Sequence, residues 1–310
     1  MSMVAGGTLG VTFPDGTTLA ATNVSTFFSP ALTDTANVLT IQPNVQFNGT
    51  SGLTANGKVY TTAPTIYTAS YFIAAGGGGA NFGGGGGGGY LTSTASFYSG
   101  TTYAIVVGPG GAGATYPSNG GNGGNSSIIA TGLSLIATGG GGAGGTGVGQ
   151  NGGSGGGASI GTQAGGTGVS GQGFAGGSST AATFNAGGGG GGASAVGTNA
   201  VSQTQGGNGG NGIATSISGS SVTYCGGGAG CSTNGGGGGS NGTGGGGTAN
   251  TGGGGGGNGV TLNSGGSGVV IISVPTASYS GIYTGTVSPA PYTSGANTII
   301  IFTGSGTYTA

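Results

Sequence analysis

The chain lacks His, Arg, Glu and Trp, and its only charged side chains are Asp15, Asp34 and Lys58 among 310 residues. A metal centre of His, Cys and carboxylate ligands has too few ligands here, and a His-based catalytic triad cannot be built. The paired carboxylates of a glycoside hydrolase would have to be Asp15 and Asp34. We therefore expect no enzymatic activity, no bound metal and no cofactor.

The shortage of positive charge also limits the partners. Binding to nucleic acid depends on several Lys or Arg side chains that neutralise phosphates, and Lys58 stands alone. The apolar run at 269–272 is far shorter than the ~18 residues of a membrane span, and the first residues lack the basic and apolar regions of an export signal. We expect no nucleic acid partner, no membrane insertion, and synthesis in a cytoplasm. The flexible spacer between Cys225 and Cys231 would permit a disulfide, but a reducing compartment favours free thiols.

Glycine dominates what is present, with 91 residues that lie almost entirely between 74 and 275. Glycine, Ser and Pro at this level without a period are typical of low-complexity disorder. Disordered chains usually stay soluble by carrying charge, however, and this chain has a net charge of −1. Disorder is therefore the alternative to an ordered glycine fold.

Residues before 70 favour short β-strands joined by turns, because Thr, Val, Ile, Phe and Tyr are frequent there. Pro14-Asp15-Gly16 predicts a turn between two short apolar stretches. Asn56-Gly57 predicts a second β-hairpin. The segment GLTANGK at 52–58 also matches the start of a phosphate-binding loop, but Val59 replaces the required Ser or Thr and a hairpin is the better interpretation.

Apolar segments interrupt the glycine runs and predict strands that anchor them. They lie at 70–74, 102–107, 127–130, 133–136, 215–217, 222–224 and 268–273. The runs between them lack the strict three-residue glycine period and the proline of collagen. Polyglycine II helices remain, with about 3.1 Å per residue and backbone N–H groups free to bond to neighbours. Asn, Ser and Thr are expected on the outer layer or at the reversals.

Aromatic side chains among the glycines are candidate contact residues. Tyr116, Phe174 and Phe184 each lie between glycine runs, where a loop reversal is expected, and an exposed ring there can stack on a sugar or fill a pocket. The alternative is that these rings cover the open ends of the glycine helices.

Several segments resemble bacteriophage sequences. VTFPDGTTLAAT at 11–22 is similar to an element near the start of phage tail fibres. FIAAGGGG at 72–79, TYAIVVGPGGAG at 102–113, NSSI at 125–128 and GGSGVVII at 265–272 follow the order of the glycine-rich domain of phage tail fibres and related adhesins. NTIIIFTGSGTYT at 297–309 resembles the strand that opens such a domain, so it either completes this domain or begins a second copy.

Together these patterns predict a mainly β and irregular fold with essentially no α-helix. A β-rich attachment region at 1–69 is followed by a glycine-rich domain of packed polyglycine II-type helices at 70–275 and a C-terminal strand segment at 276–310. The resemblance implies a tail fibre or fibre-tip protein of the virion, synthesised in the host cytoplasm, that binds a host glycan or outer-membrane protein. Its other partners are tail or fibre proteins bound through the N-terminal region, and a homotrimer is expected. The alternative is a decoration or fibre-shaft protein without receptor specificity.

Overall fold

The computed structural model describes residues 64–179, 186–202, 204–231, 245–257 and 262–310, together with the backbone of six short strands before residue 64. The chain divides into two compact units, Met1–Pro64 and Thr65–Ala310. In the residues described, the fold is mainly β, with one short 3-10 helix at Thr276–Ser278 and no α-helix. The predicted fold class is confirmed at this level.

In its described residues, the first unit contains three antiparallel strand pairs. They pair β1 (Leu9–Thr12) with β2 (Thr18–Ala21), β3 (Leu32–Thr35) with β4 (Val38–Ile41), and β5 (Leu53–Ala55) with β6 (Lys58–Tyr60). Ala55 pairs directly with Lys58, so two residues connect β5 and β6. This pairing confirms the predicted hairpin, and Asn56-Gly57 themselves lie outside the described residues. The turn predicted at Pro14-Asp15-Gly16 falls between β1 and β2, and its own residues lie outside those described.

The second unit is built on a nearly closed, barrel-like antiparallel sheet, which contains nine strands among the described residues. Its main path runs β11 (Leu133–Ala137), β10 (Ser126–Ala130), β9 (Thr102–Val106), β17 (Asn297–Thr309), β14 (Val269–Pro275), β7 (Ile66–Ala74) and β8 (Tyr90–Tyr98). The two end strands, β11 and β8, lie against each other. Two further strands, β15 (Ile282–Val287) and β16 (Tyr292–Ser294), pair with β17.

Strand β17 connects the two parts of this sheet. Its first half pairs with β14, from Asn297 with Pro275 to Phe302 with Val270, and its second half pairs with β9, from Gly306 to Thr309. Gly304 and Ser305 lie between the halves, and Gly306 begins the second. Glycine inside a strand is typical of a bend at a barrel corner. The 297–309 segment thus completes this sheet. The domain ranges 1–69, 70–275 and 276–310 remain a prediction.

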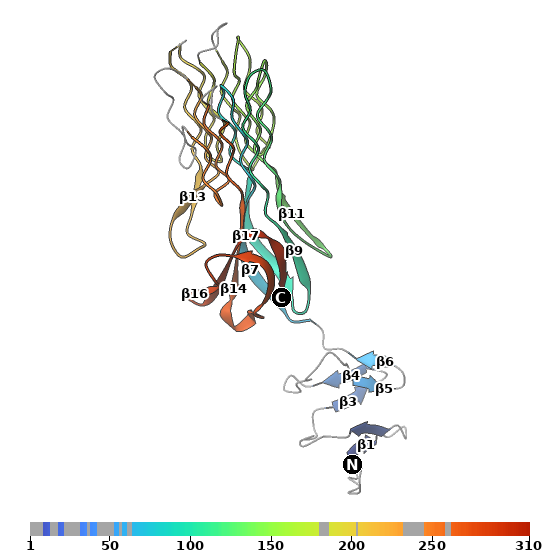
Figure 1. Cartoon of the computed structure of the whole chain (residues 1–310). Helices are drawn as coiled ribbons and strands as arrows, with labels where there is room; N and C mark the ends of the chain where they lie inside the picture. Colours follow the sequence, from blue (N-terminus) through green and yellow to red (C-terminus); the bar gives the residue numbers. More distant parts are fainter. Residues whose placement is uncertain are drawn as a thin grey trace. The chain divides into compact units, whose positions relative to one another are not determined.

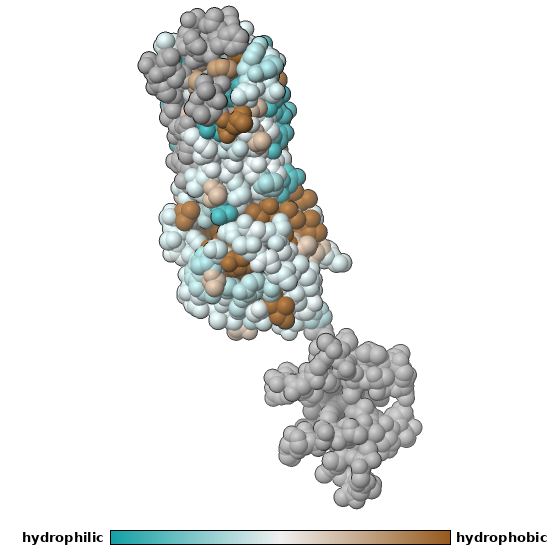
Figure 2. Space-filling view, viewed as in Figure 1, coloured by the Kyte–Doolittle hydropathy of each residue, from teal (hydrophilic) through white to brown (hydrophobic). Residues whose placement is uncertain are grey.

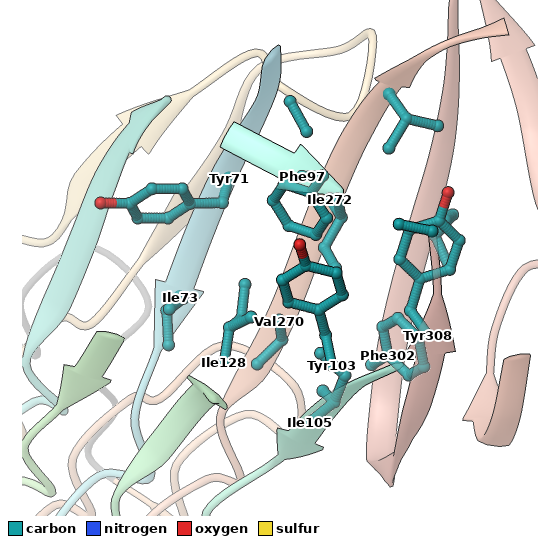
Figure 3. Packing of buried hydrophobic residues seen from close by; sticks show 14 of the residues in the cluster. Tyr71, Ile73, Phe97, Tyr103, Ile105, Ile128, Val270, Ile272, Phe302 and Tyr308 are labelled. Carbon is teal, nitrogen blue, oxygen red and sulfur yellow. The ribbon is translucent and has the colours of Figure 1, made fainter. Parts of the chain in front are cut away.

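The apolar core is divided between the two faces of the sheet, because β7 and β14 are buried on both. Tyr71 and Ile73 of β7 and Ile272 of β14 belong to the larger cluster inside the barrel (Figure 3). Phe72 of β7 and Ile271 of β14 point to the opposite face. A small hairpin of β12 (Ile213–Thr215) and β13 (Val222–Tyr224) contributes Tyr224 to this second cluster, and its ring centroid lies 4.8 Å from that of Phe72.

Extended glycine segments leave the strands and run side by side (Figure 1). We call them the glycine bundle, made of residues 75–89, 107–125, 138–179, 186–202, 204–212, 225–231, 245–257 and 262–268. Strand β7 leads into the bundle at Ala75, and the chain returns to β8 after Gly89. The sheet therefore holds the ends of the glycine segments together.

Candidate functional site: the glycine bundle

Backbone hydrogen bonds connect the segments of the glycine bundle with a three-residue recurrence. Along residues 75–80, consecutive N–H groups donate to three different neighbours, and every third N–H returns to the same one. Gly76 and Gly79 donate to segment 120–124, Gly77 and Ala80 to segment 263–266, and Ala75 and Gly78 to segment 86–89, with N···O distances of 2.8–3.0 Å. These bonds satisfy the buried N–H groups without any side chain.

Segment 84–89 lies at the centre of this arrangement. Its N–H and C=O groups bond to six surrounding segments in the described part of the chain, which are 75–78, 138–141, 154–157, 188–191, 225–228 and 252–255. Some neighbours run antiparallel to it, and segment 188–191 runs parallel. The bundle is thus a three-dimensional hydrogen-bonded array and not a sheet.

The spacing between these segments leaves no room for side chains. A Cβ added at Gly78 would overlap the carbonyl oxygen of Gly141, and one added at Gly85 would overlap that of Gly78. Both Cβ–oxygen distances would be far below 3.0 Å, a separation that real Cβ atoms essentially never fall under. The obstruction is backbone in each case, so no side-chain rotation can relieve it. Close backbone approach therefore explains why the runs contain glycine.

Asparagine side chains cover one outer side of the bundle. Asn119, Asn122 and Asn125 are exposed, and their Oδ1 atoms accept hydrogen bonds from the buried N–H groups of Gly145, Gly142 and Gly139 at 2.7, 2.8 and 2.9 Å. The side chains take the place of a missing neighbouring segment. An outer position for Asn was expected, but this ladder was missed, although Asn at every third position from 119 to 125 signals it.

The bundle has a strand-side end and a far end. The far end is the one away from the sheet, and the chain reverses there at Ala80–Gly83. The turns near 115–118, 145–148 and 159–161 lie around this reversal. Asn81 Nδ2 donates to the Ser118 carbonyl, and the Gly83 N–H donates to Ser159 Oγ. Apolar side chains are exposed there from separate parts of the chain: Tyr116 (44% exposed), Val148 (56%), Val201 (68%) and Leu262 (63%).

The three predicted contact residues do not lie together. Tyr116 follows Ala114, whose N–H donates to the Ala80 carbonyl at the far end. Phe174 is 45% exposed but lies near the strand-side end, because its N–H donates to Gly192, next to Ala193 of the cluster around β14. Phe184 lies outside the described residues. Reversals inside near-uniform glycine runs carry little turn signal, which is why the sequence did not separate the two ends.

Burial shields both cysteine thiols of the bundle. Cys225 is buried and Cys231 is half-buried, and both are free thiols, as expected. Burial raises the pKa of each thiol above its ordinary value, which keeps both protonated at neutral pH. Over the described ranges, no group of three or more His, Cys, Asp or Glu side chains gathers that could hold a metal ion. Within the same residues, no helix is long and apolar enough to cross a membrane.

One comparison with known proteins gives a match. The family model of the glycine-rich domain matches residues 54–275, well over half of the chain. No curated protein and no solved structure matches the sequence or the fold.

Proposed function

Because the chain belongs to the glycine-rich domain family, we propose that its glycine bundle is a packed array of polyglycine II helices and forms the host-binding part of a bacteriophage tail fibre or fibre tip. In this role the protein is not an enzyme. The observation that carries the proposal is a side-chain-free array that holds several reversals at one end, where Tyr116, Val148, Val201 and Leu262 are exposed.

The hydrogen-bond recurrence supports polyglycine II geometry. A helix of three residues per turn points every third N–H in the same direction, and residues 75–80 return to the same neighbour every third residue. Six neighbours around segment 84–89 agree with hexagonal packing of such helices. Fibre diffraction or vibrational spectroscopy of the purified protein tests this, and a spectrum of β-sheet alone would contradict it.

The far end of the bundle supports receptor binding. Exposed apolar side chains on a rigid support are typical of contact surfaces, and preorganised loops lose little entropy on binding. We propose a host surface glycan or outer-membrane protein as the receptor, with Tyr116 as a contact residue at this end. Phe174, near the strand-side end, and Phe184 are proposed as further contacts. The region 1–69 would attach the protein to other tail or fibre proteins of the virion, after synthesis in the host cytoplasm.

An apolar outer surface supports the expected homotrimer. Val106 of β9, Ile129 of β10 and Ile136 of β11 are each at least 40% exposed, and pairing of these strands places them on one face. The exposed face of an antiparallel sheet is normally polar. Figure 2 shows hydrophobic surface where the bundle meets the sheet. Because residues 65–310 carry no charged side chain, this neutral face suits a second copy better than a charged partner. Sedimentation of the full chain at the mass of one copy would contradict the trimer.

Antibody labelling of virions tests the location. Label at the distal end of a fibre supports the adhesin, label along the fibre shaft or on the capsid supports a shaft or decoration protein, and an unlabelled virion contradicts both.

Single substitutions then test receptor contact. Because Tyr116 and Phe174 lie at different ends of the bundle, virions with Tyr116→Ala are compared with virions carrying Phe174→Ala and Phe184→Ala. Val196→Ala is a matched control, since Val196 is 55% exposed near Phe174 and belongs to none of the proposed contacts. Unchanged adsorption of a virion with all three aromatic residues replaced would exclude these contacts, whereas label at the fibre tip would still support the location.

A further inference from the structure

Five described asparagines are followed directly by glycine, at 119, 122, 151, 208 and 211. In such a pair, the backbone nitrogen of the glycine can attack the side-chain amide carbon of the asparagine. A five-membered succinimide forms and ammonia leaves, and water then opens the ring to aspartate or isoaspartate. The reaction needs a glycine N–H free of other bonds and an asparagine side chain able to turn toward it.

At Asn119 and Asn122, hydrogen bonds occupy both the glycine N–H and the asparagine side chain. Gly120 donates its N–H to the Ala143 carbonyl at 3.0 Å, and Gly123 donates to Gly140 at 2.9 Å. The Oδ1 atoms of Asn119 and Asn122 are engaged by other backbone N–H groups. Asn151 is held in the same way, since its Oδ1 accepts from the Thr167 N–H and the Gly152 N–H donates to the Thr167 carbonyl.

Asn211-Gly212 differs from these three pairs. Asn211 is exposed, at the end of a glycine segment just before β12. Its carbonyl oxygen accepts from the Ser194 N–H at 2.9 Å. Neither its side-chain amide nor the Gly212 N–H forms a hydrogen bond with another residue in the described part of the chain. The groups that must react are therefore both available.

We propose that Asn211 is a site of spontaneous deamidation in the folded protein, and that the glycine bundle protects Asn119, Asn122 and Asn151. The product places a negative charge in residues 65–310, which otherwise contain no charged side chain. Isoaspartate also lengthens the backbone by one atom. The added atom lies between Gly210, whose N–H donates to the Gly190 carbonyl, and the start of β12 at Ile213. Deamidation would thus alter the bundle where it joins the β12–β13 hairpin.

The experiment incubates the purified full chain at mildly alkaline pH and physiological temperature, in its folded state and in concentrated guanidinium chloride. Because the chain has almost no trypsin sites, pepsin digestion at low pH and mass spectrometry measure deamidation at each asparagine. In the folded protein we expect Asn211 to react at least about tenfold faster than Asn119 or Asn122, a difference of about 1.4 kcal/mol in activation free energy. In the unfolded chain the three rates should be similar.

Two variants make the result independent of the digest. Asn211→Gln should lower the early release of ammonia from the folded protein, because closure of the larger ring is slow. The matched control Asn122→Gln should leave that release unchanged. Equal rates at Asn122 and Asn211 in the folded protein, or an Asn211 that reacts only after unfolding, would overturn the proposal.

Discussion

Substitution of Gly85 by Ala tests whether side-chain-free contact holds the bundle together. Gly85 is buried in the central segment, and an added Cβ would overlap the carbonyl oxygen of Gly78. Gly85 also donates to the Gly255 carbonyl at 2.8 Å and accepts from the Gly228 N–H at 2.9 Å. Its φ lies outside the left-handed region, so alanine is opposed by the lack of space and not by backbone strain.

The expected loss of stability is about 3 kcal/mol. Overpacking of a close-packed interior costs about 1–3 kcal/mol, and displacement of two backbone hydrogen bonds adds about 1 kcal/mol for each. The lower entropy of the unfolded alanine chain offsets about 0.4–1 kcal/mol. For a unit of this size, the sum corresponds to a Tm lower by about 6–12 °C.

Gly147→Ala is the matched control. An added Cβ at Gly147 meets nothing within 4 Å, and its φ is also outside the left-handed region. This variant should therefore match the wild type or gain up to about 1 kcal/mol. Thermal unfolding followed by circular dichroism compares the three proteins. A Gly85→Ala protein that melts with the wild type, or a Gly147→Ala protein that loses as much, would refute the reasoning.

Three further predictions concern the same unit. Asn122→Ala should lower the free energy of unfolding by about 1 kcal/mol, because the buried Gly142 N–H loses its acceptor, while Asn122→Asp should keep most of it; urea titration measures both. Neutral alkylating reagents should label Cys231 slowly and Cys225 only after unfolding, since burial raises both thiol pKa values and Cys225 is fully buried; rapid labelling of native Cys225 would contradict the packing. Residues 65–310 contain no Asp, Glu, His, Lys or Arg, so their stability should not change from acidic to neutral pH. Burial raises the pKa values of the Cys225 thiol and of four phenols, so these groups ionise more easily in the unfolded chain, and the stability should fall above about pH 9. Urea titrations across pH check this. The phenols are Tyr67, Tyr103, Tyr224 and Tyr279.

The sequence located most of the anchoring strands, because short apolar segments stand out against glycine. The segment expected at 215–217 shares only Thr215 with β12, and the one at 70–74 covers only the last part of β7. The segments expected at 102–107, 133–136 and 222–224 correspond to β9, β11 and β13 within one residue. Strand β8 was missed because residues 90–98 are rich in Ser and Thr and its middle part is largely exposed, which leaves a weak apolar alternation. Local pattern therefore locates strands that have a buried face and overlooks those that have little of one.

Long-range arrangement was beyond the sequence. The composition of 297–309 predicts a strand, but its place between β14 and β9 depends on pairing with residues far away along the chain. The positions of reversals in the bundle were equally hidden, since glycine follows glycine on both sides of each turn. The sequence therefore predicted the same contact role for Phe174 and Tyr116, although they lie at different ends of the bundle.

The position of β17 has a consequence for the order of folding. The strand follows every other strand of its sheet in the sequence, yet it lies between β9 and β14 and pairs with both. During synthesis, the edge of β9 and the edge of β14 stay without this partner until β17 is made. Contacts of such large sequence separation also slow folding. We therefore expect the barrel to close in a late step after β17 is made, and until then the unpaired edges of β9 and β14 are open to pairing with another chain.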